Sequence, residues 1–196
     1  MADRGGNNEQ SEGVTGSGPT TVLVVDDEAA IREMYSQYLD AAGYAVRTAA
    51  DGEAGLAAVD DDVDIVLLDR RMPDRSGEAV LEEIRARNVD CQVALVTGVE
   101  PDFDLVEMNC DDYLVKPVDR GALLETVERL ALLEEYNEAQ RHLSSLRVKR
   151  NVLEVEKSPD DLQRSEEYEH LEDRIRELER ELDDLESEFD GQVGYE

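Results

Sequence analysis

The hydrophobic pattern divides the chain into a part that alternates between strand and helix and a part that is helical throughout. In the first part, short apolar and β-branched runs occur at Thr21–Val25, Tyr44–Thr48, Ile65–Leu68, Val93–Val96 and Tyr113–Val115. Amphipathic segments with apolar residues at helical spacing lie between them, at Glu28–Ala42, Asp51–Val59 and Gly77–Arg87. Runs this short and apolar are typical of strands buried on both faces. The alternation predicts an α/β fold in which helices cover both faces of a parallel sheet.

Local signals place several helix boundaries. Gly43 is expected to end the first helix, because glycine readily adopts the left-handed conformation found after helices. Asp51 and Asp119 are expected to cap the helices that follow them, since an aspartate side chain accepts from the free amides of a first turn. A further helix is expected within Pro101–Asn109, where the segment is short.

From Leu123 onward the apolar residues keep helical spacing. The first run, with steps of four and three, is Leu132, Tyr136, Ala139, Leu143, Leu146 and Leu153, with Arg150 in the remaining slot. The second run, typical of a coiled-coil seam, is Leu171, Ile175, Leu178, Leu182, Leu185 and Phe189. Ser158-Pro159 separates the runs, because proline disfavours helix at the residue before it. Helices from Gly121 to Glu156 and from Asp161 to Phe189 should form an α-helical hairpin.

The two helices of this hairpin offer unequal numbers of large apolar residues. The second helix contributes six large apolar residues. Over the same length the first helix contributes four, Leu143, Leu146, Val152 and Leu153. Part of the 171–189 seam is therefore expected to face another chain, because such a patch does not stay exposed in a monomer. The simplest partner is the same seam of a second copy, which predicts a homodimer through the C-terminal helices.

Composition adds a strong acidic imbalance. The 196 residues include 50 acidic and 20 basic side chains, which gives a formal net charge of −30. This charge argues against general binding to nucleic acid or to an anionic membrane, because phosphates would be repelled. Only three of the basic residues are Lys. The balance is typical of a halophilic protein, since about 1 M salt screens charges beyond roughly 3 Å; a mesophilic acidic protein is the alternative.

The N-terminal segment, residues 1–19, is rich in Gly, Ser, Asn and Glu and is predicted to be disordered. It contains no apolar run, so no signal peptide is expected. The chain also lacks any stretch of about 18 apolar residues of the kind that spans a bilayer. We therefore expect a cytoplasmic protein with no membrane partner.

Polar side chains follow four of the five predicted strands. The first strand is followed by Asp26 and Asp27, the third by Asp69, the fourth by Thr97 and the fifth by Lys116. Because parallel strands present their carboxyl ends at one edge, these side chains should converge there. Three converging carboxylates need a cation, and oxygen ligands favour Mg²⁺.

This set of groups suits the transfer of a phosphoryl group to a carboxylate. Asp69 is the best acceptor, because it projects from the central strand between the other groups. Lys116 and the cation would neutralise the phosphoryl oxygens, and Thr97 would donate a hydrogen bond. Each residue alone could have a purely structural role, such as a helix cap or a strand end. Their joint occurrence at the same edge of the sheet favours a shared functional site.

Four segments now reveal a resemblance. VLVVDDE (22–28), LLDRRMPDRSG (67–77), LVTG (95–98) and DDYLVKP (111–117) resemble the CheY-like receiver domain of two-component response regulators. The resemblance spans residues 20–136. It implies a flavodoxin-like, doubly wound, five-stranded parallel sheet with five helices, and a phosphorelay in which a sensor histidine kinase is the phosphate donor.

The resemblance also implies a role for each site residue. Asp26, Asp27 and Asp69 would hold Mg²⁺ together with the backbone carbonyl of Arg71, and Asp69 would be phosphorylated. Thr97 and Lys116 would bind the phosphoryl group, Tyr113 would be the aromatic switch, and the bond before Pro117 would be cis. No catalysis beyond self-phosphorylation and autodephosphorylation is implied, so we do not expect an enzyme.

Two features depart from the family pattern. Thr97 and Lys116 are closer in sequence than in many receivers, and the missing residues fall in the fourth helix, which usually reports phosphorylation. Arg71 places a cation near the phosphate, where it would alter dephosphorylation, or it points to solvent.

Residues 137–190 resemble the HalX domain of haloarchaeal regulators, and residues 191–196 form a short tail. HalX proteins are commonly grouped with transcription regulators. Within this domain Arg141, Arg147, Lys149 and Arg150 lie in a stretch without acidic residues. They would contact DNA or an acidic partner, or pair with Glu166, Glu167, Glu169 or Glu172 on the returning helix. Two functions remain open, a regulator of transcription and a signalling adaptor that binds protein and not DNA.

Overall fold

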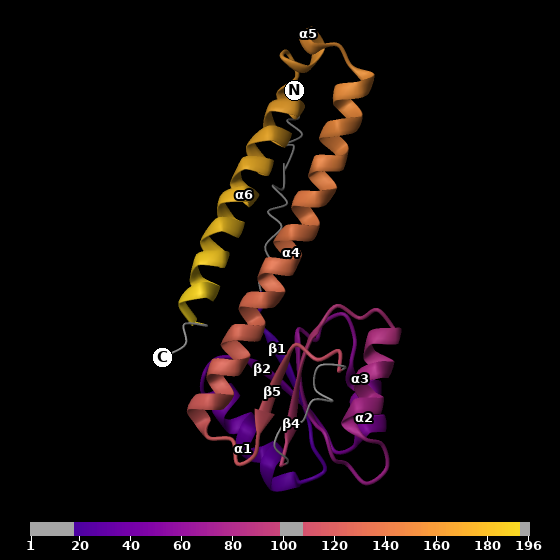
Figure 1. The fold of residues 1–196 in the computed structure, drawn as a ribbon, viewed down its shortest axis with the longest axis vertical. Coiled ribbons are helices and arrows are strands. Elements are labelled where there is room, and N and C mark those ends of the chain that lie inside the picture. The colour runs from indigo at the N-terminus through magenta and orange to yellow at the C-terminus, as the bar shows by residue number, and fades with distance from the viewer. Residues whose placement is uncertain (1–17, 99–107, 193–196) are drawn as a thin grey trace, which may run out of the picture.

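A computed structural model describes residues 18–98 and 108–192 and shows a parallel five-stranded sheet in the order β2-β1-β3-β4-β5. The strands are β1 (Thr21–Val25), β2 (Ala45–Ala49), β3 (Ile65–Asp69), β4 (Gln92–Thr97) and β5 (Asp112–Val115). The connecting helices in the described residues are α1 (Ala29–Asp40), α2 (Gly52–Ala58) and α3 (Gly77–Ala86). The predicted α/β fold is thus confirmed (Figure 1).

The strands are buried on both faces, as their composition predicts. Alternate residues of β1 belong to different core clusters: Leu23 and Val25 pack with α2 and α3, whereas Val22 and Val24 pack with α1 and the start of the long helix that follows β5. This alternation follows from the two-residue period of a strand. The sheet is therefore wound on both sides, and its carboxyl edge is left free for polar groups.

The predicted helix caps are present. Asp51 Oδ1 accepts from the Ala54 amide at 2.7 Å, and Asp119 Oδ1 accepts from the Ala122 amide at 2.9 Å. Gly43 follows α1 with φ of +97°, a left-handed conformation that favours glycine. The helix expected within Pro101–Asn109 falls largely on residues 101–107, which lie outside the described part of the chain.

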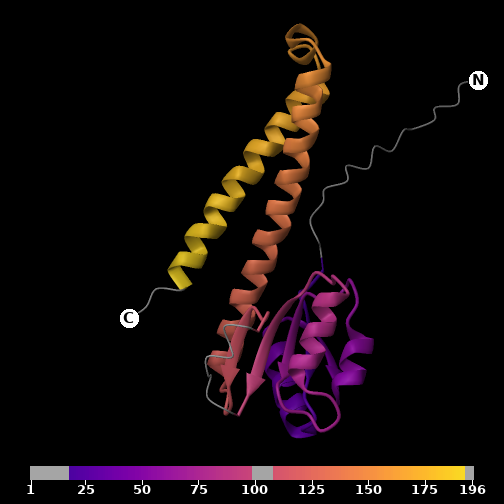
Figure 2. The same cartoon turned by 45° about the vertical axis from the view of Figure 1, so that its right-hand side comes forward.

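One helix leaves the α/β domain and becomes the first arm of the hairpin. This helix, α4 (Arg120–Glu156), has 37 residues. The chain then turns through the short α5 (Pro159–Leu162) and returns along α4 as α6 (Glu166–Gln192), so the predicted hairpin is confirmed (Figures 1 and 2). None of the helices in the described ranges is both long and apolar enough to cross a membrane.

The returning helix begins later than the predicted Asp161. Ser158 Oγ accepts from the Asp161 amide at 3.2 Å and so caps the separate short helix α5, which starts with Pro159. Ser165 Oγ then accepts from the Tyr168 amide at 3.1 Å, inside the first turn of α6. Two serine caps in succession therefore divide a segment that the apolar spacing alone joins.

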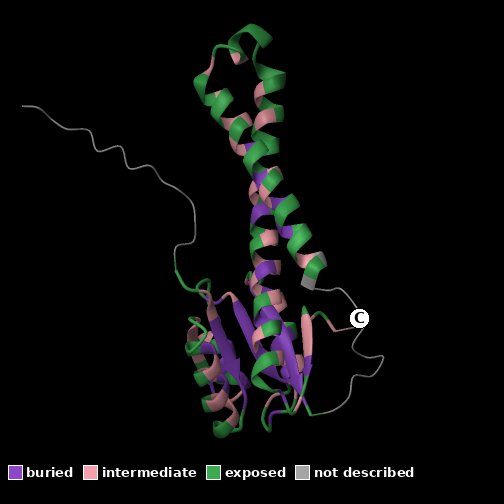
Figure 3. Cartoon of the chain, turned by 90° about the vertical axis from the view of Figure 1, so that its left-hand side faces the viewer, coloured by how far each residue is buried: buried purple, intermediate pink, exposed green. Residues whose placement is uncertain are grey.

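The 171–189 seam is buried inside the hairpin itself. Ile175, Leu178, Leu182 and Leu185 are at most 8% exposed, and the first three pack on Ala139, Leu143 and Leu146 of α4. Figure 3 shows buried positions where the two helices cross. Val152, expected in this seam, is 56% exposed, and the lower part of α4 contributes Tyr136 and Ala139 instead. The argument for a dimer through this seam was therefore wrong, because α4 already covers it.

Candidate functional site

The structure brings Asp26, Asp69 and Lys116 together at the carboxyl edge of the sheet. Asp26 follows β1, Asp69 ends β3 and Lys116 follows β5. Lys116 Nζ lies 2.7 Å from Asp26 Oδ2 and 2.8 Å from Asp69 Oδ1. The ammonium, which reaches in from the end of the edge strand β5, thus bridges two carboxylates from the neighbouring strands β1 and β3.

Burial makes this bridge necessary. Asp26 is 2% exposed, Asp69 is 5% exposed and Thr97 is fully buried. A buried carboxylate without a partner is costly, and two adjacent ones repel each other. Lys116 supplies a positive charge that compensates both carboxyl groups inside the protein.

The pKa values reflect the same balance. Burial raises the pKa of Asp69, although the hydrogen bond and the charge of Lys116 act in the opposite direction. Burial alone would lower the pKa of Lys116, but its hydrogen bonds to Asp26 and Asp69 outweigh burial and raise the pKa. Lys116 is therefore a fixed cation over the whole physiological range.

The loop after β3 holds Asp69 in place. The Arg71 amide donates to Asp69 Oδ2 at 3.1 Å. The loop returns close to β3, because a Cβ at Gly77 would lie 2.3 Å from the Asp69 carbonyl oxygen. Glycine is required there, and the Gly77 amide donates to the Arg70 carbonyl at 2.9 Å. Gly77 thus helps to fix the position of Asp69.

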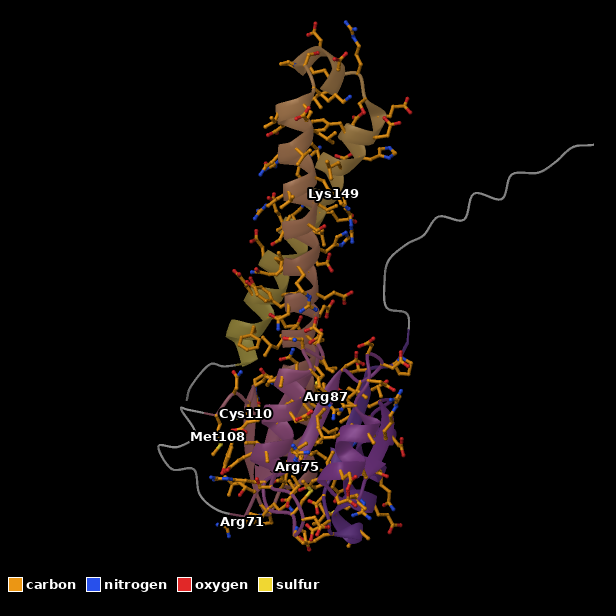
Figure 4. All side chains as sticks on the ribbon, turned by 90° about the vertical axis from the view of Figure 1, so that its right-hand side faces the viewer. Arg71, Arg75, Arg87, Met108, Cys110 and Lys149 are labelled. Atoms are coloured by element: carbon orange, nitrogen blue, oxygen red, sulfur yellow. The ribbon has the colours of Figure 1, made fainter. Side chains whose placement is uncertain are left out.

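Asp27 and the side chain of Arg71 lie outside the buried group. Both are exposed, and Arg71 projects away from the body of the domain (Figure 4). No cluster of three His, Cys, Asp or Glu side chains arranged for a metal occurs among residues 18–98 and 108–192. In this conformation Lys116 occupies the space between the two buried carboxylates, and the third predicted ligand stays at the surface.

Tyr113 lies on β5 and has a partner that the sequence did not indicate. Its hydroxyl accepts from Arg70 Nη1 at 3.5 Å, and Arg70 Nε donates to Glu78 Oε1 at 2.6 Å. Arg70 directly follows Asp69, so one residue links the end of β3 to Tyr113 on β5. The Lys116–Pro117 bond is cis.

The basic stretch of α4 is mostly paired within the chain. Arg147 lies 2.8 Å from Glu179 of α6, and Arg150 lies 3.8 Å from Glu172. Arg141 pairs instead with Asp90 of the α/β domain at 2.8 Å. Lys149, on the stem of the hairpin (Figure 4), is exposed and forms no ion pair with any described residue. Pairing therefore accounts for three of the four cations.

Comparison with known proteins decides the family. The model of the response regulator receiver domain matches residues 22–128, more than half of the chain. The chain belongs to this family. The model of the HalX domain matches residues 123–194. The two matches overlap inside α4, so the receiver and HalX domains share one helix; the expected division at residues 136 and 137 falls within that helix and stays a prediction.

Several relatives resemble the receiver domain. A Haloferax volcanii protein named "Putative transcriptional regulator" is 50% identical over 125 residues, which cover 64% of this chain and 22% of that protein. The chain spans about half the length of other curated relatives. A Methanospirillum hungatei receiver domain has TM-score 0.56 and 31% identity, covering 60% and 98% of the two chains. Response regulator TrrA of Thermotoga maritima, solved with Mg²⁺-BeF, has TM-score 0.50 and 35% identity, covering 57% and 98%.

These findings identify the chain as a response regulator with a receiver domain and a C-terminal HalX domain. The resemblance that the motifs carry is confirmed, as is the doubly wound fold.

Proposed function

We propose that Asp69 accepts a phosphoryl group from a sensor histidine kinase and that the HalX hairpin passes the signal on. The observation that supports this most is the Lys116 ammonium, which is bonded to two buried carboxylates at the carboxyl edge of the sheet. An oxygen of Asp69 would attack phosphorus, and the phosphorus–nitrogen bond to the kinase histidine would break as the imidazole takes a proton. The strand-end position of Asp69 orients it for this attack.

Lys116 and Thr97 would hold the product. Phosphorylation puts about two negative charges where one stood, so the ammonium can turn from the Asp69 carboxylate to the phosphoryl oxygens. Thr97 ends the neighbouring strand, with its side chain fully buried, so its hydroxyl would be drawn toward the same oxygens. Tyr113, two positions before Val115 on β5, would follow this movement as the aromatic switch.

The residues present suit Mg²⁺. All the proposed donors are oxygens, from Asp26, Asp27, Asp69 and the Arg71 carbonyl, which favours a hard divalent ion. Mg²⁺ would supply positive charge for the phosphoryl oxygens. A Mg²⁺-BeF complex of a related response regulator supports this proposal.

Acetyl phosphate, a small-molecule phosphoryl donor, tests the assignment. The full chain should form an acid-stable, base-labile adduct in the presence of Mg²⁺ and little without it. Asp69→Asn should abolish the adduct, whereas Asp74→Asn, at an exposed aspartate on the same loop, should leave it unchanged. Normal uptake by Asp69→Asn would disprove the assignment.

For the output, we infer regulation of transcription in the cytoplasm. The names of curated relatives support this over an adaptor without a role in transcription. Since three cations of the basic stretch are paired, the HalX domain would act mainly through protein contacts, including contact with a second copy. Genome-wide occupancy of a tagged chain, compared with Asp69→Asn, should show sites that depend on phosphorylation. Equal, uniform occupancy of both would favour the adaptor.

A further inference from the structure

The outer face of α4 carries a concentration of exposed apolar side chains. The described residues contain four large hydrophobic residues that are clearly exposed, and three of them are Val148, Val152 and Val155, with exposures of 62%, 56% and 81%. Their spacing of four and three places them on one side of the helix. We call these three residues the valine face. Single exposed valines are common, but a stripe at helical spacing marks a contact with another helix.

The valine face points away from the hairpin core. Leu143 and Leu146, which are buried against α6, lie roughly on the opposite side of α4. Nothing else among the described residues covers the stripe, since all three valines remain more than half exposed. The face is therefore built for a partner outside this hairpin.

Charge limits what that partner can be. From residue 139 to residue 153 the helix contains no acidic residue, whereas α6 has thirteen acidic residues and three Arg. Two copies, each with a net charge of −30, approach most easily through a surface with few acidic residues, where those present have a cation opposite them. Nucleic acid fits poorly, because Lys149 is the one unpaired cation of the basic stretch and Glu156 lies beside the valine face.

The flank of the valine face specifies an orientation. Lys149 and Glu156 are seven residues apart, so they lie on the same side of the stripe, and both are exposed with no ion pair to a described residue. In an antiparallel two-fold pair, identical flanks of the two helices meet. A pair centred near Val152 would then place each Lys149 beside Glu156 of the other copy. A parallel pair would bring opposite flanks together and leave both charges unmatched.

We propose that two copies of this chain associate through the valine faces of their α4 helices, antiparallel and centred near Val152, with reciprocal Lys149–Glu156 pairs. This proposal rests on the proposed role of the HalX hairpin in self-association and replaces the 171–189 seam with a different face. The hairpin tips would overlap, and the receiver domains would lie at opposite ends of the assembly.

Sedimentation velocity of the full chain in about 2 M KCl, where repulsion is screened, tests this. The wild type should be a dimer. Val152→Glu should weaken association by at least about 100-fold, because it places two like charges at the centre. Ser187→Glu, which adds the same charge at an exposed position of α6, should not change association, and circular dichroism should show equal helicity in both variants.

Charge reversal tests the orientation. Lys149→Glu and Glu156→Lys should each weaken the dimer, and the double variant should restore it. A monomeric wild type, a Val152→Glu variant that still dimerises, or a double variant as weak as the single ones would overturn the proposal. Phosphorylation of Asp69 is measured on the same samples and should be intact in Val152→Glu. Loss of phosphorylation in the wild type would instead contradict the proposed function.

Discussion

The receiver domain and the HalX hairpin are stabilised in different ways. The receiver domain has two apolar layers around a sheet whose strands are almost completely buried, and its few buried charges are paired within the site. The hairpin has one thin seam and a surface dominated by carboxylates. A domain with two apolar core clusters is thus joined to a hairpin with one thin seam by a continuous helix, so we expect the two parts to respond differently to the same perturbation.

Salt should separate the two regions most clearly. Below about 0.5 M KCl, repulsion among the thirteen acidic residues of α6 is less screened, so the hairpin should lose structure before the receiver domain does. Hydrogen exchange measured by mass spectrometry should show early loss of protection in peptides from 137–192. Full protection of both regions at low salt, without Mg²⁺, would remove the halophilic interpretation.

Loss of Lys116 should affect only the receiver domain. Lys116→Met leaves the Asp26 and Asp69 carboxylates buried side by side, which should destabilise the domain by about 3 kcal/mol. Urea unfolding followed by hydrogen exchange provides the measurement, and added Mg²⁺ should recover part of the loss. Lys157→Met, at an exposed lysine, is the control. Equal stability of Lys116→Met and the wild type would show that the bridge is unimportant for folding.

The opposite result is expected for the hairpin seam. Leu178→Ala removes a side chain that is 2% exposed and should cost about 2–4 kcal/mol in the hairpin, while Asp69 still takes up phosphate. Unfolding of peptides from α6 should shift, and those from β3 should not. Glu177→Ala, at the exposed neighbouring position, should change stability by less than about 0.5 kcal/mol. Equal losses in both regions would mean that the two parts unfold as one unit.

A smaller change should strengthen the hairpin. Arg150 lies at the position of α4 where the four-three spacing calls for an apolar residue. Its buried Nε has no hydrogen-bond partner, and the nearest carboxylate oxygens, of Glu154 and Glu172, are 3.8 Å away. Arg150→Leu would complete the apolar spacing and should stabilise the hairpin by about 1 kcal/mol. Thermal unfolding monitored by circular dichroism measures the effect. A lower melting temperature would show that the Arg150 pairs stabilise more than the missing apolar contact would.

The smallest effect is expected where the two regions meet. Burial raises the pKa of Glu134, against the hydrogen bond from Gln92 and the charge of Arg141. A raised carboxyl pKa favours folding below the unfolded pKa, and this contribution is lost as pH rises through the folded pKa. As the pH falls from 7 to 5, the free energy of unfolding of the wild type should therefore rise relative to that of Glu134→Gln. Urea unfolding of both proteins at each pH tests this; an unchanged difference would contradict it.

The sequence predicts the receiver domain better than the hairpin, for physical reasons. In the receiver domain, strand order and strand ends determine which residues converge, so Asp26, Asp69 and Lys116 could be placed together in advance. The contact of Arg70 with Tyr113 joins residues 43 positions apart through side-chain geometry that no spacing encodes.

In the hairpin, apolar spacing defines a stripe but does not say which stripe faces inward. Val152 follows helical spacing with both Val148 and Val155, and it was assigned to the wrong side. The partner of Arg141 was also missed, because Asp90 belongs to the receiver domain. The structure therefore corrects the prediction of which helix faces are buried in the HalX hairpin, and it supports the fold predicted for the receiver domain.

Because α4 is continuous, a movement of the helix where it packs on the receiver domain displaces its far end in the hairpin. Its base is tied to β5 by the bond from Arg129 Nε to Asp112 Oδ2 at 2.9 Å, and no flexible linker follows. A helix of this length extends roughly 55 Å, so a tilt of about 5° at the base would carry its far end about 5 Å sideways. A sub-ångström rearrangement around Asp69 that tilts the base of α4 could thus be amplified by the length of the helix into a displacement comparable to one helical turn.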